Sequence, residues 1–62
     1  MQFLRLEVYE KCDGREEVVF VREKPIFTET HRSIKTMNTK MLNWATKQFP
    51  NYSRIEINVK EK

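Results

Sequence analysis

One histidine, His31, and one cysteine, Cys12, are the side chains of this chain best suited to nucleophilic or acid–base chemistry. A catalytic histidine needs a nucleophile or substrate group to act on, and a third group to orient its ring. Cys12 is followed by Asp13, and this acidic neighbour opposes any activation of the thiol by Lys11. Because neither side chain has the partners that catalysis requires, we expect both to be structural or simply exposed.

The other chemical groups also argue against an enzyme. One histidine and one cysteine provide no zinc-ligand spacing, and a single glycine leaves no phosphate-cradling loop. Glutamates are numerous in the first 23 residues, but we expect them to form cross-strand pairs with neighbouring cations rather than a catalytic dyad. The sequence therefore predicts a non-enzymatic protein with no cofactor, no metal and no small-molecule substrate.

The length of 62 residues allows one domain, residues 1–62, with a small core. Pairing with a second copy would widen its narrow stability margin. A lone cysteine excludes an internal disulfide, which favours a reducing, cytoplasmic setting. No apolar run approaches the ~20 residues that span a bilayer, so we expect no membrane contact.

A sustained 3.6-residue apolar period predicts one helix over residues 30–49. Thr28 or Thr30 would cap its start, and Pro50 would end it. Its apolar side chains fall in one arc of roughly 160°. The members of this arc are Ile34, Met37, Met41, Leu42, Trp44, Ala45 and Phe49.

Period-two alternation predicts strands over residues 2–10 and 53–60. Asp13-Gly14 favours a hairpin turn to a second strand over 15–24. Pro25 should break that strand, so that Ile26 and Phe27 fold over the end of the core. The order ββαβ predicts an α+β fold, with an antiparallel three-stranded sheet of order 2-1-3 and the helix on one face.

Two hairpin registers are compatible with the residues of the second strand. A two-residue turn pairs Val8 with Val19 and Leu6 with Val21. A three-residue loop with Gly14 as a bulge instead pairs Val8 with Val18 and Leu6 with Phe20. We favour the three-residue loop, because Phe20 fills more of the core.

The outer side of the helix is basic and carries no acidic residue. Arg32, Lys35, Lys40 and Lys47 are candidate phosphate contacts, with Thr, Ser and Asn between them. A solvated helix face is the competing interpretation. Nucleic-acid binding through this helix is therefore the second of two functional hypotheses.

The first hypothesis is a small cytoplasmic binding or regulatory protein that acts through protein–protein contacts or self-association. The far face of the sheet should gather Phe3, Tyr9 and two of the apolar residues 18–21, leaving an uncovered apolar patch. Trp44, at the edge of the helical arc, is a further candidate anchor. The candidate protein interface thus comprises Phe3, Tyr9, Val19, Val21 and Trp44.

Overall fold

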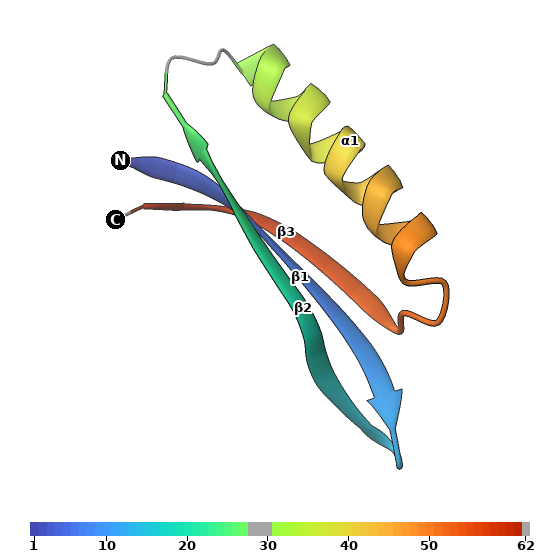
Figure 1. Cartoon of the computed structure of the whole chain (residues 1–62). Helices are drawn as coiled ribbons and strands as arrows, with labels where there is room; N and C mark the ends of the chain where they lie inside the picture. Colours follow the sequence, from blue (N-terminus) through green and yellow to red (C-terminus); the bar gives the residue numbers. More distant parts are fainter. Residues whose placement is uncertain (28–30, 62) are drawn as a thin grey trace.

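A computed structural model describes residues 1–27 and 31–61 and shows the predicted ββαβ fold (Figure 1). The elements are β1 (Gln2–Cys12), β2 (Arg15–Ile26), α1 (His31–Gln48) and β3 (Arg54–Glu61). The helix therefore begins and ends one residue inside the predicted range of 30–49. The predicted caps, Thr28 and Thr30, lie outside the described residues.

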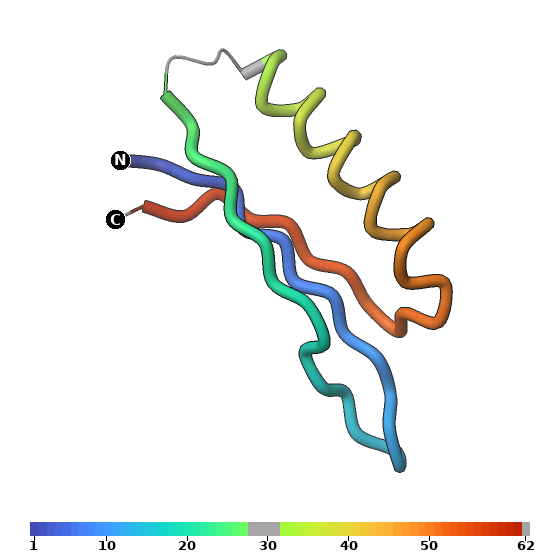
Figure 2. Tube along the Cα trace, in the orientation of Figure 1, coloured from blue at the N-terminus to red at the C-terminus, as the bar shows by residue number. Residues whose placement is uncertain are grey.

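The three strands form an antiparallel sheet of order β2-β1-β3, which confirms the predicted topology. The helix packs on one face of this sheet, and the other face is left open (Figures 1 and 2). Leu4, Leu6 and Val8 alternate on the helix side of β1 and are fully enclosed. The buried apolar core consists of Leu4, Leu6, Val8, Ile26, Met41 and Ala45.

The hairpin turn contains two residues, so the expected three-residue loop is wrong. Asp13 and Gly14 both have positive φ, 53° and 79°, and Cys12 pairs directly with Arg15. Positive φ at both central residues is the type I′ geometry, which suits the twist of the flanking strands. Glycine tolerates this backbone without strain, and aspartate is among the few other residues that adopt it readily.

A β-bulge at Val19 makes the register differ from both sequence alternatives. Tyr9 pairs with Val18 but Val8 pairs with Phe20, so Val19 is an extra residue on β2. Phe20 therefore lies on the helix side, as expected, although its partner is Val8 and not Leu6. Successive strand residues alternate between the two faces of a sheet. The extra residue therefore moves each later residue of β2 to the opposite face.

The end of β2 also differs from expectation. Pro25 does not break the strand, because β2 is an edge strand and needs no donor on its outer side. Ile26 is buried, as expected for a residue that closes the end of the core, whereas Phe27 is 72% exposed and does not fold over it. The predicted boundary at residue 24 is therefore two residues short.

The helix joins β3 through a short turn that is tied back to β1. The backbone N–H of Phe49 donates to the carbonyl of Ala45, and that of Tyr52 donates to the carbonyl of Phe49. Ser53 then donates its backbone N–H to the Tyr9 carbonyl at 2.8 Å. These bonds place the start of β3 beside the middle of the hairpin. The hairpin turn itself extends beyond the helix (Figure 1).

Candidate functional site

An aromatic cluster fixes the position of the helix over β2. The Phe20 ring lies 5.4 Å from the Trp44 ring and 5.2 Å from the Phe49 ring, measured between centroids. The guanidinium carbon of Arg22 lies 5.3 Å from the centroid of Trp44, in cation–π geometry. Trp44 is thus half-buried on the helix side of the sheet, and the sheet separates it from the candidate interface residues Phe3, Tyr9 and Val21.

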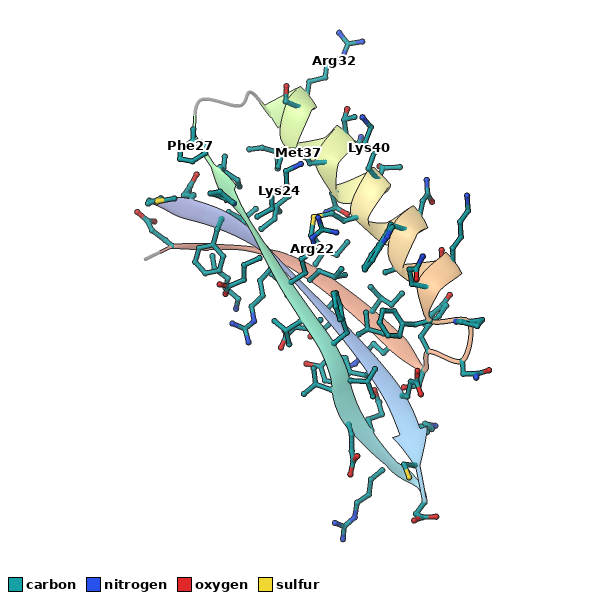
Figure 3. All side chains as sticks on the ribbon, in the orientation of Figure 1. Arg22, Lys24, Phe27, Arg32, Met37 and Lys40 are labelled. Carbon is teal, nitrogen blue, oxygen red and sulfur yellow. The ribbon has the colours of Figure 1, made fainter. Side chains whose placement is uncertain are left out.

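A basic surface extends across the two elements that meet at this cluster. The four helical cations predicted from sequence lie on the exposed side of α1. Two cations of β2 lie on the same side of the sheet as the helix. These are Arg22 and Lys24, which pair with the buried residues Leu6 and Leu4 of β1. Figure 3 shows both cations between β2 and α1. We call this set the basic face; its members are Arg22, Lys24, Arg32, Lys35, Lys40 and Lys47.

Carboxylates are kept away from the basic face. Residues 31–48 include no Asp or Glu. On the helix side of the sheet, glutamates occur only in the end rows, at Glu10 and Glu17 near the hairpin turn and at Glu61 beside Gln2. Among the residues that the structure describes, none forms an ion pair with a cation of the basic face. Within residues 1–27 and 31–61, no direct ion pair therefore offsets the positive charge of this side.

The three threonine hydroxyls Thr36, Thr39 and Thr46 of α1 do not reinforce the basic face as donors. Thr36 and Thr39 donate to the carbonyls of Arg32 and Lys35, at 3.0 and 3.1 Å. Thr46 donates in the same way to the carbonyl of Asn43 at 3.0 Å. Because each hydroxyl carries one hydrogen, these donors are engaged within the helix. An anion would consequently be held by the ammonium and guanidinium groups, not by the threonines.

We call the uncovered side of the sheet the open face. Its charges balance, with four cations, Arg5, Lys11, Arg54 and Lys60, and four carboxylates, Glu7, Glu16, Glu23 and Glu56. Arg5 contacts Glu7 and Glu23 at 3.7 and 3.1 Å. Arg54 contacts Glu16 and Glu56, both at 3.2 Å. These half-exposed pairs add little stability, but they cancel the field of the open face.

Apolar groups lie between these ion pairs. Val18 and Val21 share the open face with Tyr9 and Glu7, their partners on β1. Val18, Val19 and Val21 are 51%, 45% and 42% exposed, which is unusual for valine in a strand. A pocket of about 300 Å³ opens further along the same face. It is lined by Met1, Phe3, Glu23 and Pro25.

Tyr9 lies at the centre of the open face, between Val18 and Arg54. The Arg54 guanidinium carbon lies 4.2 Å from the centroid of its ring. Desolvation, the negative charge of Glu7 and a hydrogen bond to Glu7 raise the pKa of the Tyr9 hydroxyl above its ordinary value, against the opposing effect of Arg54. The environment of Tyr9 thus favours the neutral phenol.

Replacing Glu7 with glutamine is expected to lower the pKa of Tyr9, because the carboxylate charge that opposes ionisation is removed. Ultraviolet titration of the phenolate, in a Tyr52→Phe background that leaves Tyr9 as the only tyrosine, measures this pKa directly. The raised pKa stabilises the fold fully below the ordinary tyrosine pKa of about 10, and this contribution is lost as pH rises through the folded value. An unchanged midpoint in Glu7→Gln would contradict the assignment.

The two residues with catalytic potential belong to different elements of the fold. Cys12 is exposed next to the hairpin turn, and His31 begins α1 at a distant point of the sequence. Within residues 1–27 and 31–61, no three His, Cys, Asp or Glu side chains gather in a way that could hold a metal ion. In the same ranges, no helix has the length and apolar character that crossing a bilayer requires.

Sequence reasoning identified most of these surface residues but missed Arg22 and Lys24 on the basic face. The centre of β2, Val18 to Val21, is apolar on both faces, and only the bulge at Val19 determines that both cations face the helix. Comparison with known proteins adds no relative from which a role could be carried over. The chain matches no family model, no curated protein and no solved structure.

Proposed function

We propose that this chain is a small non-enzymatic binding protein that acts through protein–protein contact, with a second copy of itself as the partner on the open face. The observation that supports this is the row of exposed valines on β2 beside Tyr9. Apolar side chains gathered on one uncovered sheet face favour burial against another protein surface. The exposed Cys12 thiol suits a reducing compartment such as the cytoplasm.

The charge distribution favours a second copy as the partner. The chain has a net charge of +3, so two copies repel each other when their basic faces approach. The open face is locally neutral because its arginines and glutamates are paired. Two open faces can therefore meet without a net electrostatic penalty, in the isologous contact that a twofold dimer requires.

Face-to-face packing of two open faces would also bury the apolar side chains that the core leaves exposed to solvent. Stacked sheets lie about 10 Å apart, which brings side chains of the two faces into contact. The pocket beside Phe3 offers a receptor for an apolar side chain of the partner. A 62-residue domain has a small core, so extra buried area would add measurably to its stability.

Replacing Val21 with lysine is expected to convert a dimer into a monomer, because it puts like charges into the twofold contact. The substitution should leave the fold intact, since Val21 is 42% exposed and its partner on β1 is Glu7. Val59→Lys is the matched control, because Val59 is 50% exposed and lies on the helix side, opposite Leu4. Sedimentation equilibrium over a range of protein concentrations measures the association.

The wild-type chain and Val59→Lys should both associate, with little dependence on salt, because the contact is neutral. A wild-type chain that stays monomeric at millimolar concentration would overturn self-association. Equal dissociation of Val21→Lys and Val59→Lys would also contradict the assignment to the open face. Circular dichroism of each variant establishes that any monomer is folded.

A further inference from the structure

The basic face is a second surface, on the opposite side of the sheet from the open face. We infer that it binds the phosphate backbone of double-stranded nucleic acid, independently of base sequence. The site is built by α1 and β2 together, so that Arg22 and Lys24 join the helical cations. This inference does not depend on self-association, because one copy of the chain carries all six cations.

The two groups of cations meet at Trp44. Arg22 lies over the Trp44 ring, and Lys40 precedes Trp44 by one helical turn. Figure 3 shows Lys40 on the outer side of α1 and Arg22 and Lys24 between the helix and β2. The β2 cations and the helical cations are therefore on the same side of the sheet, with Trp44 between Arg22 and the helix. The helical part of the basic face, from Arg32 to Lys47, is about 22 Å long at 1.5 Å per residue, long enough to follow several successive phosphates.

The composition of the basic face favours nucleic acid over an acidic protein or a membrane. Protein interfaces depend on apolar and aromatic anchors, and the exposed side of α1 offers Lys, Arg, Thr and Asn instead. A membrane-surface helix inserts its apolar side into the lipid, but that side of α1 is occupied by the sheet through Met41 and Ala45. Apart from Leu42, which is 40% exposed, the exposed side of α1 is polar and cationic, and the cations suit phosphate.

The aromatic residues favour a duplex over a single strand. Single-strand binding relies on exposed aromatic rings on which bases stack. On the helix side, Phe20, Trp44 and Phe49 instead pack against one another, and Arg22 covers the Trp44 ring. Within residues 1–27 and 31–61, these three rings are thus already engaged with one another and with Arg22, which leaves less of their faces for bases to stack on. Phosphates of a duplex can bind to the cations alone. A duplex presents its phosphates at fixed spacing, and its bases stay stacked.

The test is fluorescence anisotropy with a labelled duplex of about 20 base pairs. We expect binding at low salt that weakens about 100-fold between 50 and 200 mM monovalent salt if about four phosphates are contacted. Two duplexes of unrelated sequence should bind equally well. Absence of binding at 50 mM salt, tighter binding of the matching single strand, or equal binding to phosphatidylserine vesicles would each overturn the inference.

The double variant Lys24→Gln/Lys40→Gln removes one cation from each element. Losing two phosphate contacts should weaken duplex binding roughly 100-fold at 50 mM salt and reduce the slope of log affinity against log salt by about two. The control Lys11→Gln/Arg15→Gln removes the same charge beside the hairpin turn and should retain most of the affinity. Lys24→Arg/Lys40→Arg keeps both charges and should bind like the wild type.

Equal losses of duplex affinity in Lys24→Gln/Lys40→Gln and Lys11→Gln/Arg15→Gln would show that binding depends only on the net charge of the chain. That result would contradict a localised site. Val21→Lys separates this inference from the proposed dimer, because it changes the open face and leaves the basic face intact. Duplex binding by a monomeric Val21→Lys variant would support the site, whereas its loss together with the dimer would contradict a site contained in one copy. Circular dichroism checks that every variant is folded.

Discussion

Truncation of Leu6 to alanine is expected to cost about 3 to 5 kcal/mol of unfolding free energy, the range for fully enclosed leucines. Leu6 is 0% exposed and lies in the central strand, between Arg22 of β2 and Ile57 of β3. A domain of this size has a total stability of only roughly 3 to 9 kcal/mol. The variant should therefore lose at least about a third of the stability of the domain.

Urea denaturation followed by the fluorescence of Trp44, the single tryptophan, measures this loss. All variants should be compared at one protein concentration, since association would add to the apparent stability. Leu6→Met keeps the volume of the side chain and should cost less than about 1.5 kcal/mol. A loss below about 1 kcal/mol in Leu6→Ala would contradict the position of Leu6 at the centre of the core.

Replacing Phe20 with alanine should cost about 3 kcal/mol, near the lower end for phenylalanine because the ring is only half-buried. The loss comes from the contacts of Phe20 with Trp44 and Phe49. Val19→Ala is the matched test of register. Val19 is 45% exposed and has no partner on β1, so its truncation should change stability by no more than about 0.5 kcal/mol.

The two variants together decide whether the bulge exists. Without it, the two-residue turn would place Val19 opposite Val8, toward the helix, and leave Phe20 outside. Val19→Ala would then be the costly substitution and Phe20→Ala the mild one. Thermal unfolding by circular dichroism gives the order of the two losses independently of the tryptophan signal.

The fold could be predicted because its periodic signals are local. Strand alternation in β1 follows from Leu4, Leu6 and Val8, and each of these residues is buried as predicted. The helix follows from an apolar arc whose central members, Met41 and Ala45, pack on the sheet. Strand order 2-1-3 follows from a short hairpin and one helical connection. Each inference needed only the residues of one segment.

Burial was less predictable at the margins of the same elements. Val59 and Leu42 have the correct phase for the core but remain 50% and 40% exposed. The position of a residue in the apolar repeat predicts the direction in which its side chain points. Burial also requires another element of the fold to cover that side chain. A single 18-residue helix leaves the edges of a three-stranded sheet uncovered. Val18 and Val21 of β2 are exposed for a different reason, because they lie on the open face, opposite the helix (Figure 1).

The candidate surfaces follow from one tertiary event, the bulge at Val19. The sequence by itself determined the ββαβ order, the hairpin at Asp13-Gly14 and the uncompensated charge of the helix, because these depend on local periodicity, turn chemistry and composition. It did not determine the face on which Val21 and Arg22 lie, because 15–24 is apolar on both sides at its centre. Only tertiary packing decided which face these residues occupy. The type I′ turn sets a register that would turn Phe20 away from the helix, whereas the core needs this side chain on the helix side. The extra residue in β2 reconciles the turn with the burial of Phe20.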